Sequence, residues 1–284
     1  MVTMKRLLIA GYGDIARRAR PLLESRFECH VLTRAQGMDL DRPASLAALA
    51  PADAVLHCAP PPAAGSADTR TANLLTALEG TRILPTRFVY LSTSGVYGDC
   101  DGAWIDETRA LNPQSDRAKR RADAEAQLAL WCSARSVALV VLRVPGIYAA
   151  DRLPLARLRA GTPVLRTGED VYTNHIHADD LAAICARALQ DDAPAGTYHA
   201  SDDTQLKMGD WFDLVADHLG LPRPPRIMRA EAAARLPAPL LSFMSESRRL
   251  SNARLKQALG IRLRYPTVQE GLKHAHAARL HEPA

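Results

Sequence analysis

A glycine-rich turn near the start of the chain constrains its fold more than any other feature. The mostly apolar run 5–10 is typical of a buried strand, and it ends at Gly11 in the sequence Gly-Tyr-Gly-Asp-Ile-Ala. A stretch of helix-forming residues, 17–24, follows this turn. The spacing Gly-x-Gly-x-x-Ala between a strand and a helix is one form of the fingerprint with which a βαβ unit binds a dinucleotide.

The small residues of this turn have separate physical roles. Gly11 permits the tight turn, and Ala16 lets the helix pack closely against the strand. At Gly13 any side chain would block the approach of a pyrophosphate. Asp14 and Ile15 lie where free backbone N–H groups and the positive end of the helix dipole favour phosphate. We therefore expect Gly11, Gly13, Asp14 and Ile15 to bind a dinucleotide; a purely structural glycine turn is the alternative.

The end of the next strand bears on the choice of cofactor. Residues 27–32 read as a strand, and Thr33 and Arg34 follow it. A site selective for NAD usually has Asp or Glu about 20 residues after the glycines. A guanidinium at this point can instead bind a 2′-phosphate through two hydrogen bonds. Thr33 and Arg34 therefore predict NADP(H) rather than NAD(H), with a merely solvated surface arginine as the alternative.

Strands and helices alternate through the first half of the chain. This rhythm predicts an α/β fold with a Rossmann-type doubly wound parallel sheet, which binds its ligands at the carboxyl ends of the strands. A smaller C-terminal lobe completes the expected fold. The expected strands are 54–59, 87–92 and 137–144, and the expected helices are 67–78 and 117–133.

The alternation loosens after about residue 149, where proline-rich joins separate shorter helical stretches. A helix at 179–190 and a strand at 196–200 are expected to return to the main sheet. We predict an NAD(P)-binding Rossmann domain from residues 1–148 plus about 174–202. The small substrate-side lobe is expected to comprise residues 149–173 and 203–284.

Composition excludes several classes of partner. The formal charge is +5, but the arginines are scattered and no basic run is interleaved with aromatic residues, so we expect no nucleic-acid binding. No apolar stretch approaches the length of a membrane span, and we expect no membrane association. The five cysteines form no Cys-x-x-Cys pair, which fits reduced thiols in the cytoplasm.

Three motifs further along the chain point to a known family. They are Leu-Ser-Thr-Ser-Gly-Val-Tyr-Gly at 91–98, Arg-Val-Pro-Gly-Ile-Tyr at 143–148 and His-Ile-His-Ala-Asp-Asp-Leu at 175–181. With the glycine turn, they make the chain resemble the extended short-chain dehydrogenase/reductases, the NAD(P)-dependent epimerase/dehydratase family. The resemblance implies that the following residues contact the cofactor: Asp39 and Leu40, near its adenine, and Ala59, Pro60 and Pro145 at strand ends.

The resemblance also implies a catalytic set of Ser/Thr, Tyr and Lys, and here the chain departs from the family. Thr93 matches the Ser/Thr. Alignment on Asn-Pro at 112–113 and on Glu125 puts Arg117 and Arg121 where the family has Tyr and Lys. Arginine stays protonated near neutral pH and cannot act as a general acid or base. Arg121 can still hold ribose hydroxyls or a phosphate, and we expect it to bind the cofactor.

Two interpretations of these arginines remain open. Because Arg117, Arg121 and Glu125 share one helix face, the arginines are either an anion clamp beside the nicotinamide or substrate, or part of a solvated face with an Arg121–Glu125 ion pair. Tyr97 and Tyr148, at strand ends, are the expected replacement acids, and each also reads as a structural residue.

Histidines near the catalytic edge are weaker candidates for chemistry. His57 ends a predicted strand and could replace the missing acid, although a structural role is the other interpretation. His175 and His177, followed by Asp179 and Asp180, lie on a short extended segment before a helix N-terminus. We expect no metal there.

The sequence leaves two functions open. The first is an oxidoreductase or epimerase that uses NAD(P) and a non-standard acid/base on a small polar or sugar-like molecule. The second is a catalytically inactive NADP(H)-binding sensor or scaffold. The expected partners are the dinucleotide and a small-molecule substrate, and a homodimer is left open.

Overall fold

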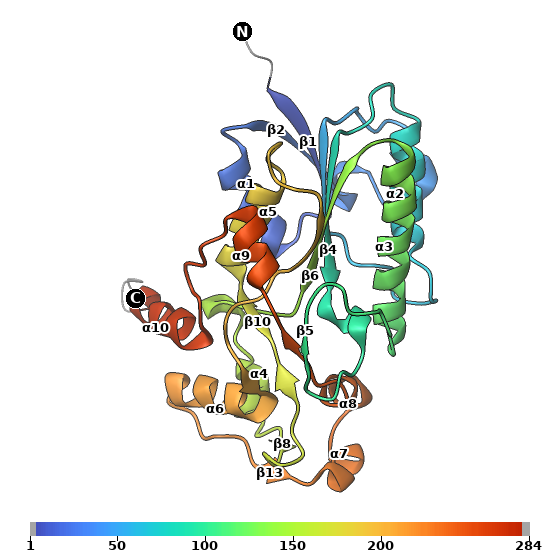
Figure 1. The fold of residues 1–284 in the computed structure, drawn as a ribbon. Helices are drawn as coiled ribbons and strands as arrows, with labels where there is room; N and C mark the ends of the chain where they lie inside the picture. The colour runs from blue at the N-terminus through green and yellow to red at the C-terminus, as the bar shows by residue number, and fades with distance from the viewer. Residues whose placement is uncertain (1–3, 280–284) are drawn as a thin grey trace.

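The computed structural model describes residues 4–279, and its main feature is a six-stranded sheet in which every neighbouring pair is parallel (Figure 1). The strand order is β11-β6-β4-β3-β1-β2. The chain runs from β1 to the edge strand β2 and then crosses to β3 on the other side of β1. The strands are β1 (Lys5–Ala10), β2 (Phe27–Leu32), β3 (Ala54–His57), β4 (Arg87–Thr93), β6 (Ala138–Val144) and β11 (Gly196–His199).

This crossover places a topological switch point between β1 and β3. In sheets of this kind the loops after the strands open a crevice at such a point, and ligands bind there. The predicted Rossmann-type doubly wound parallel sheet is therefore confirmed. A ligand site is therefore expected at the carboxyl edge of the sheet.

Helices cover both faces of the sheet, as Figure 1 shows: α1 and α5 lie on one side and α2 and α3 on the other. Side chains of β1 alternate between them, because successive residues of a strand point to opposite faces. Leu7 and Ile9 pack with α1 and α5, whereas Leu8 and Ala10 pack with α2 and α3. The helices are α1 (Asp14–Leu23), α2 (Thr69–Glu79), α3 (Asp116–Ala134) and α5 (Ala178–Ala188).

Most expected elements are present, with ends that differ by a few residues. Helix α1 begins at Asp14, three residues before the predicted start, because Gly13 already serves as its N-cap. Strand β3 ends at His57 rather than at residue 59. The N–H groups of Cys58 and Ala59 both donate to the carbonyl of Ala10, at 2.8 and 2.9 Å, which stops the ladder.

The later part of the chain forms short helices and two-stranded ladders. Ladder β14–β5 joins this part to the loop after β4, and β7–β10 joins it to the end of β6. Two apolar clusters lie within it, one around Trp211 and Phe212 and one around Leu165 and Ile227. The elements are β5 (Trp104–Ile105), β7 (Gly146–Tyr148), α4 (Leu155–Arg159), β8 (Val164–Leu165), β9 (Tyr172–Thr173), β10 (His175–His177), β12 (Leu206–Lys207), α6 (Met208–Leu219), β13 (Arg226–Ile227), α7 (Arg229–Arg235), α8 (Ala238–Met244), β14 (Arg249–Leu250), α9 (Ala253–Leu259) and α10 (Val268–Arg279).

The division into a Rossmann domain and a substrate-side lobe stays a prediction. Its outermost residues, 1–3 and 280–284, lie outside the described residues. Within residues 4–279, no helix combines the length and the apolar character that crossing a bilayer requires.

The glycine turn is held against the end of β3. Gly11 has φ +89°, a conformation that L side chains rarely adopt, and a Cβ there would lie 2.4 Å from the backbone nitrogen of Ala59. Gly13 has an ordinary φ, and a Cβ there would meet nothing within 4 Å. Gly11 is therefore needed by the fold, whereas the space at Gly13 lies free for a ligand.

We predict that Gly11→Ala lowers the free energy of unfolding by about 2–5 kcal/mol, the sum of left-handed strain and overpacking. Gly37→Ala is the matched control, because Gly37 has φ +79° with nothing within 4 Å of an added Cβ. The control should show the strain alone, about 1–2 kcal/mol. Urea unfolding measures both, and equal losses would disprove the contact with Ala59.

Candidate functional site

Three cavities lie along the carboxyl edge of the sheet, and each is named here for one arginine that lines it. The Arg34 cavity has a volume of about 420 Å³, the Arg121 cavity about 180 Å³ and the Arg117 cavity about 310 Å³. The Arg34 cavity is lined by Gly11, Tyr12, Leu32, Thr33, Arg34, Met38, Asp39, Leu40, Ala59, Pro60 and Arg70. The Arg121 cavity is lined by Gly13, Asp14, Ile15, Ala16, Cys58, Leu91, Ser92, Arg121, Val144, Ile147 and Arg152.

The three cavities form a row, because residues close together in the chain line neighbouring cavities. Gly11 lines the Arg34 cavity, and Gly13 lines the Arg121 cavity. Ser92 and Val144 line the Arg121 cavity, and the residues directly after them, Thr93 and Pro145, line the Arg117 cavity. The row therefore runs from the end of β2, across the glycine turn, to the end of β4. It brings together every residue that the sequence predicts for the cofactor.

Charged side chains surround the outer end of the Arg34 cavity. The Arg34 side chain is 66% exposed, and its Nη2 donates to Asp41 at 3.0 Å. Arg70, which sequence reasoning missed, donates to both carboxylate oxygens of Asp41, at 2.7 and 2.6 Å, and to the carbonyl of Pro60. Arg70 is thus held in place, whereas Arg34 can reorient toward a ligand.

The loop at Asp39 and Leu40 is fixed by local hydrogen bonds. The carboxylate of Asp39 accepts from the N–H of Asp41 at 3.0 Å, and this bond lowers the pKa of Asp39. The side-chain amide of Asn73, on α2, donates to the carbonyl of Leu40 at 2.8 Å. The floor of the Arg34 cavity is therefore ordered without a ligand.

The Arg121 cavity combines the N-terminus of α1 with a half-buried arginine side chain. Arg121 donates to the carbonyls of Leu91 and Ala59, at 2.7 and 3.4 Å, and to the hydroxyl of Tyr90 at 3.1 Å. These bonds hold it beside the end of β4, with no carboxylate partner among the described residues. The surface ion pair with Glu125, one interpretation of the sequence, is therefore wrong.

Glu125 belongs instead to a buried network under the strand ends. Its carboxylate accepts from Arg143, with Nη2 to Oε2 at 2.7 Å, and from the hydroxyl of Ser92. The side chains of Glu125 and Arg143 are both 8% exposed. Arg143 also donates to the hydroxyl of Tyr97 at 2.6 Å, and that hydroxyl lies 2.6 Å from Nε2 of His199. The network ties α3, β4, β6 and β11 together beneath the site.

The two tyrosines predicted as acids do not line any of the three cavities. Tyr97 is 1% exposed and its hydroxyl belongs to this network; burial raises its pKa to about 12. Tyr148 is 2% exposed and donates to the carbonyl of Thr267 at 3.3 Å, and burial raises its pKa as well. The geometry therefore argues against Tyr97 and Tyr148 as the proton donors and favours structural roles for both.

The histidines near the edge are also buried. Burial lowers the pKa of His57 and of His175 to about 3, so both are neutral near pH 7. His57 lies 3.0 Å from the hydroxyl of Thr71, and His175 packs against the ring of Trp211. Within residues 4–279, no three His, Cys, Asp or Glu side chains are grouped so as to hold a metal ion.

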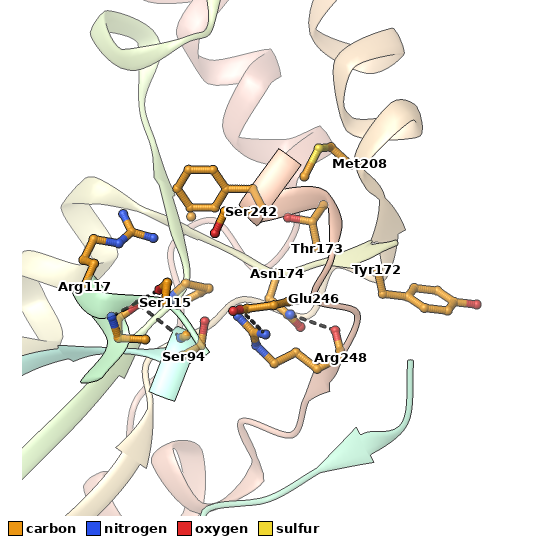
Figure 2. A pocket seen from close by; sticks show the side chains of 16 residues that line it. Ser94, Ser115, Arg117, Tyr172, Thr173, Asn174, Met208, Ser242, Glu246 and Arg248 are labelled. Carbon is orange, nitrogen blue, oxygen red and sulfur yellow. Dashed lines mark hydrogen bonds and ion pairs between the residues drawn. The ribbon is translucent and has the colours of Figure 1, made fainter. Parts of the chain in front are cut away.

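The Arg117 cavity lies beyond the end of β4 (Figure 2). Thr93 pairs with Val144, which brings Pro145 beside it. The hydroxyl of Thr93 accepts from the N–H of Gly95 at 3.2 Å and donates to no other group among residues 4–279. The cavity is lined by Thr93, Ser94, Gly95, Ser115, Arg117, Ala118, Pro145, Gly146, Tyr172, Thr173, Asn174, Met208, Ser242, Phe243, Glu246 and Arg248.

The C-terminal part of the chain supplies the far wall of this cavity. In Figure 2, Arg117 lies at one side, and Glu246 and Arg248 lie together at another. Arg248 Nη1 donates to Glu246 at 2.8 Å and to the carbonyl of Gly98 at 2.6 Å. Phe243 lies with its ring centre 4.7 Å from the Arg117 guanidinium carbon. Sequence reasoning missed Phe243, Glu246 and Arg248 because no local motif links them to Thr93.

Helix α3 carries the departure from the family pattern. It contains no tyrosine, and its one lysine, Lys119, is exposed. Ser115 is the N-cap and accepts from the N–H of Ala118 at 3.3 Å, which places Arg117 in the first turn at the cavity. Arg121 follows one turn later, at the Arg121 cavity.

The comparisons with known proteins agree with this architecture. The sequence matches the model of the NAD dependent epimerase/dehydratase family over residues 3–200. Because the match covers more than half of the chain, the chain belongs to this family. The resemblance to this family that the motifs of the chain indicate is therefore confirmed.

Three individual proteins are similar to this chain. A conserved Silicibacter pomeroyi protein of unknown function is 29% identical, with TM-score 0.77 over 97% of this chain and 99% of that one. RMD from Pseudomonas aeruginosa, in complex with NADPH, is 21% identical, with TM-score 0.73 over 96% of this chain and 98% of that one. A 3-diazoavenalumate denitrifying reductase from a Streptomyces species is 31% identical over 156 residues, which span 52% of this chain and 51% of the reductase.

We predict that Glu125→Gln lowers the free energy of unfolding by about 3–5 kcal/mol, because it leaves the buried Arg143 without its counter-charge. The matched control is Glu24→Gln. Glu24 pairs with Arg20 at 2.6 Å on the surface, with side chains 51% and 39% exposed. That pair should contribute about 0.3–0.5 kcal/mol. Urea unfolding compares the two, and similar losses would contradict a structural role for the buried pair.

Proposed function

We propose that this chain is an NADP(H)-dependent oxidoreductase that acts on a small molecule in the Arg117 cavity. The observation that carries the proposal is the row of three cavities, which starts at Arg34, crosses the open N-terminus of α1 at Gly13 and ends at Thr93. Such a row suits an extended dinucleotide with its reactive end beside a substrate space. Family membership and the name of the Streptomyces reductase support this class of chemistry.

The residues present suit a nicotinamide dinucleotide. A Cβ at Gly13 would meet nothing within 4 Å, which leaves room for a diphosphate at the N-terminus of α1. Asp39, Leu40, Ala59 and Pro60 would surround the adenosine half, and Arg121 would hold the ribose nearer the substrate. When bound, the cofactor supplies or accepts a hydride.

The preference for NADP(H) rests on two guanidinium groups at the Arg34 cavity. No carboxylate follows β2 at Thr33, where it would repel a 2′-phosphate. Arg34 is exposed and bound only to carboxylates that a phosphate could replace. Arg70 adds a second, fixed guanidinium on the same wall. The NADPH complex of the Pseudomonas protein is in line with this choice.

The reaction proceeds without a tyrosine acid. Thr93 would donate a hydrogen bond to the oxygen or nitrogen beside the carbon that gains the hydride. Arg117 cannot give up a proton near neutral pH, because its guanidinium stays charged. The proton would therefore come from water that enters the Arg117 cavity. An epimerase cycle is less well supported, because the carboxylate of Glu246 is bound to Arg248 and the side chain of Tyr172 extends away from the other labelled side chains in Figure 2.

The second candidate is a binding protein that senses NADP(H) without turnover. The replacement of Tyr and Lys by Arg117 and Arg121, inferred from the flanking motifs, favours it. The five cysteines are free thiols, which fits a reducing compartment such as the cytoplasm. A turnover assay separates an enzyme from a sensor.

We expect the protein to oxidise NADPH in the presence of at least one aldehyde, ketone or other electrophilic small molecule from a broad panel. Loss of the absorbance of reduced nicotinamide follows the reaction, and product analysis confirms hydride transfer. Gly13→Val is the control: it should stay folded, because an added Cβ meets nothing within 4 Å, and should lose both NADPH binding and turnover. NADPH binding without any turnover would favour the sensor instead.

A second prediction concerns the choice of dinucleotide. Arg34→Ala should weaken NADPH binding by about 1.5–3 kcal/mol, the value of hydrogen bonds to a charged group, and leave NADH binding nearly unchanged. Arg42→Ala is the control, because Arg42 is 75% exposed, pairs with the same Asp39 and does not line the Arg34 cavity. Calorimetry measures both cofactors. Equal weakening of NADPH and NADH by Arg34→Ala would refute the assignment.

A further inference from the structure

Arg117 is an unusual cation, because it lines a cavity and has no ion-pair or hydrogen-bond partner among the described residues. The guanidinium carbon lies 4.7 Å from the centre of the Phe243 ring. Two other arginines that line the cavities are paired, Arg70 with Asp41 and Arg248 with Glu246. The five N–H donors of the Arg117 guanidinium therefore remain available to a ligand.

The charge around Arg117 is positive. The groups that act most strongly on it are three further arginines, Arg120, Arg121 and Arg248, and the single carboxylate of Glu246. Glu246 is already bound to Arg248 at 2.8 Å. Arg120 and Arg121 donate to the backbone carbonyls of Gly65 and Leu91, and neither lines the Arg117 cavity. A negative charge in the cavity would therefore face Arg117 without any free carboxylate beside it.

Apolar groups complete the cavity. Phe243 is 46% exposed and covers one face of the guanidinium. Met208, Pro145 and Ala118 line other parts of the wall. At about 310 Å³ the space is at the small end of ligand pockets. The combination of one free cation with an aromatic side wall suits a compact ligand that has an apolar body and one anionic end.

We propose that the Arg117 cavity binds its substrate as a monocarboxylate, an acid with a small aromatic or other apolar body whose carboxylate is held by Arg117. This inference deepens the proposed function and rests on it for the claim that the ligand is the substrate. The planar guanidinium fork matches the two oxygens of a carboxylate, and the Phe243 ring would contact the body of the acid. The arginine that replaces the family tyrosine thus selects the substrate.

The number of free charges favours a carboxylate over a phosphate. A phosphate monoester carries nearly two negative charges at neutral pH and is usually held by more than one cation. Of the two arginines that line the cavity, Arg248 is neutralised by Glu246. One net positive charge remains at Arg117, which balances one carboxylate.

Calorimetric titration of matched ligands tests this directly. The probes are benzoate, trans-cinnamate and 3-phenylpropanoate, each beside its neutral amide, and phenyl phosphate as the alternative anion. At least one acid should bind about tenfold or more tightly than its amide, as expected for a charge-assisted pair. Arg117→Met should remove that difference. Lys119→Met, on the same helix and outside the cavity, removes the same charge and should keep it.

Titrations are run with and without NADPH, so that the two proposals fail separately. A protein that binds the acids but not NADPH would sink the proposed function and keep the carboxylate site. Three results would each overturn the carboxylate proposal. The first is equal affinity for every acid and its amide, and the second is tighter binding of phenyl phosphate than of any acid. The third is an acid preference that stays unchanged in Arg117→Met. NADPH binding by Arg117→Met should match that of the unmodified protein, which shows that the variant is folded.

Discussion

The site depends on the contact between the glycine turn and the end of β3. At Gly11 the backbone has φ +89° and lies so close to Ala59 that no side chain fits between them. This contact positions the start of α1 at the switch point, so that its free N–H groups open onto the carboxyl edge. Two of the cavities begin here, because Gly11 lines one and Gly13 the next.

A buried network of hydrogen bonds positions the strand ends next to the Arg117 cavity. Glu125 and Arg143 form an ion pair below β4 and β6, and Ser92, one residue before Thr93, is bound to the same carboxylate. Buried pairs of this kind are costly to desolvate and costly to break, so their residues act together. The network holds the strand ends rigid, and it also occupies the hydroxyl of Tyr97. These buried partners favour a structural role for Tyr97.

Local motifs predicted most of the cofactor side, because a strand, a turn and a helix that are adjacent in sequence form it. Gly11 and Gly13, predicted from the spacing of the turn, and Asp39 and Ala59, predicted from the family resemblance, all line the cavities. The burial of Tyr97 and Tyr148 could not be predicted, since strand position alone does not reveal which partners surround a hydroxyl.

The substrate side could not be predicted from local patterns. Phe243, Glu246 and Arg248 line the same cavity as Thr93, and Arg248 directly precedes β14, which pairs with β5. Such a pairing joins segments more than a hundred residues apart in the chain, and neither strand carries a periodic signal long enough to predict it. The unpaired state of Arg117 is likewise a property of the tertiary structure. It depends on Glu246 being bound to Arg248 and on Glu125 being bound to Arg143.

A crystal structure of the protein with NADP⁺ tests the central claim most directly. We predict the diphosphate over Gly13, the 2′-phosphate against Arg34 and Arg70, and the nicotinamide facing Thr93 at the opening of the Arg117 cavity. A cofactor bound outside the three cavities, or a nicotinamide ring turned away from Thr93, would contradict the account.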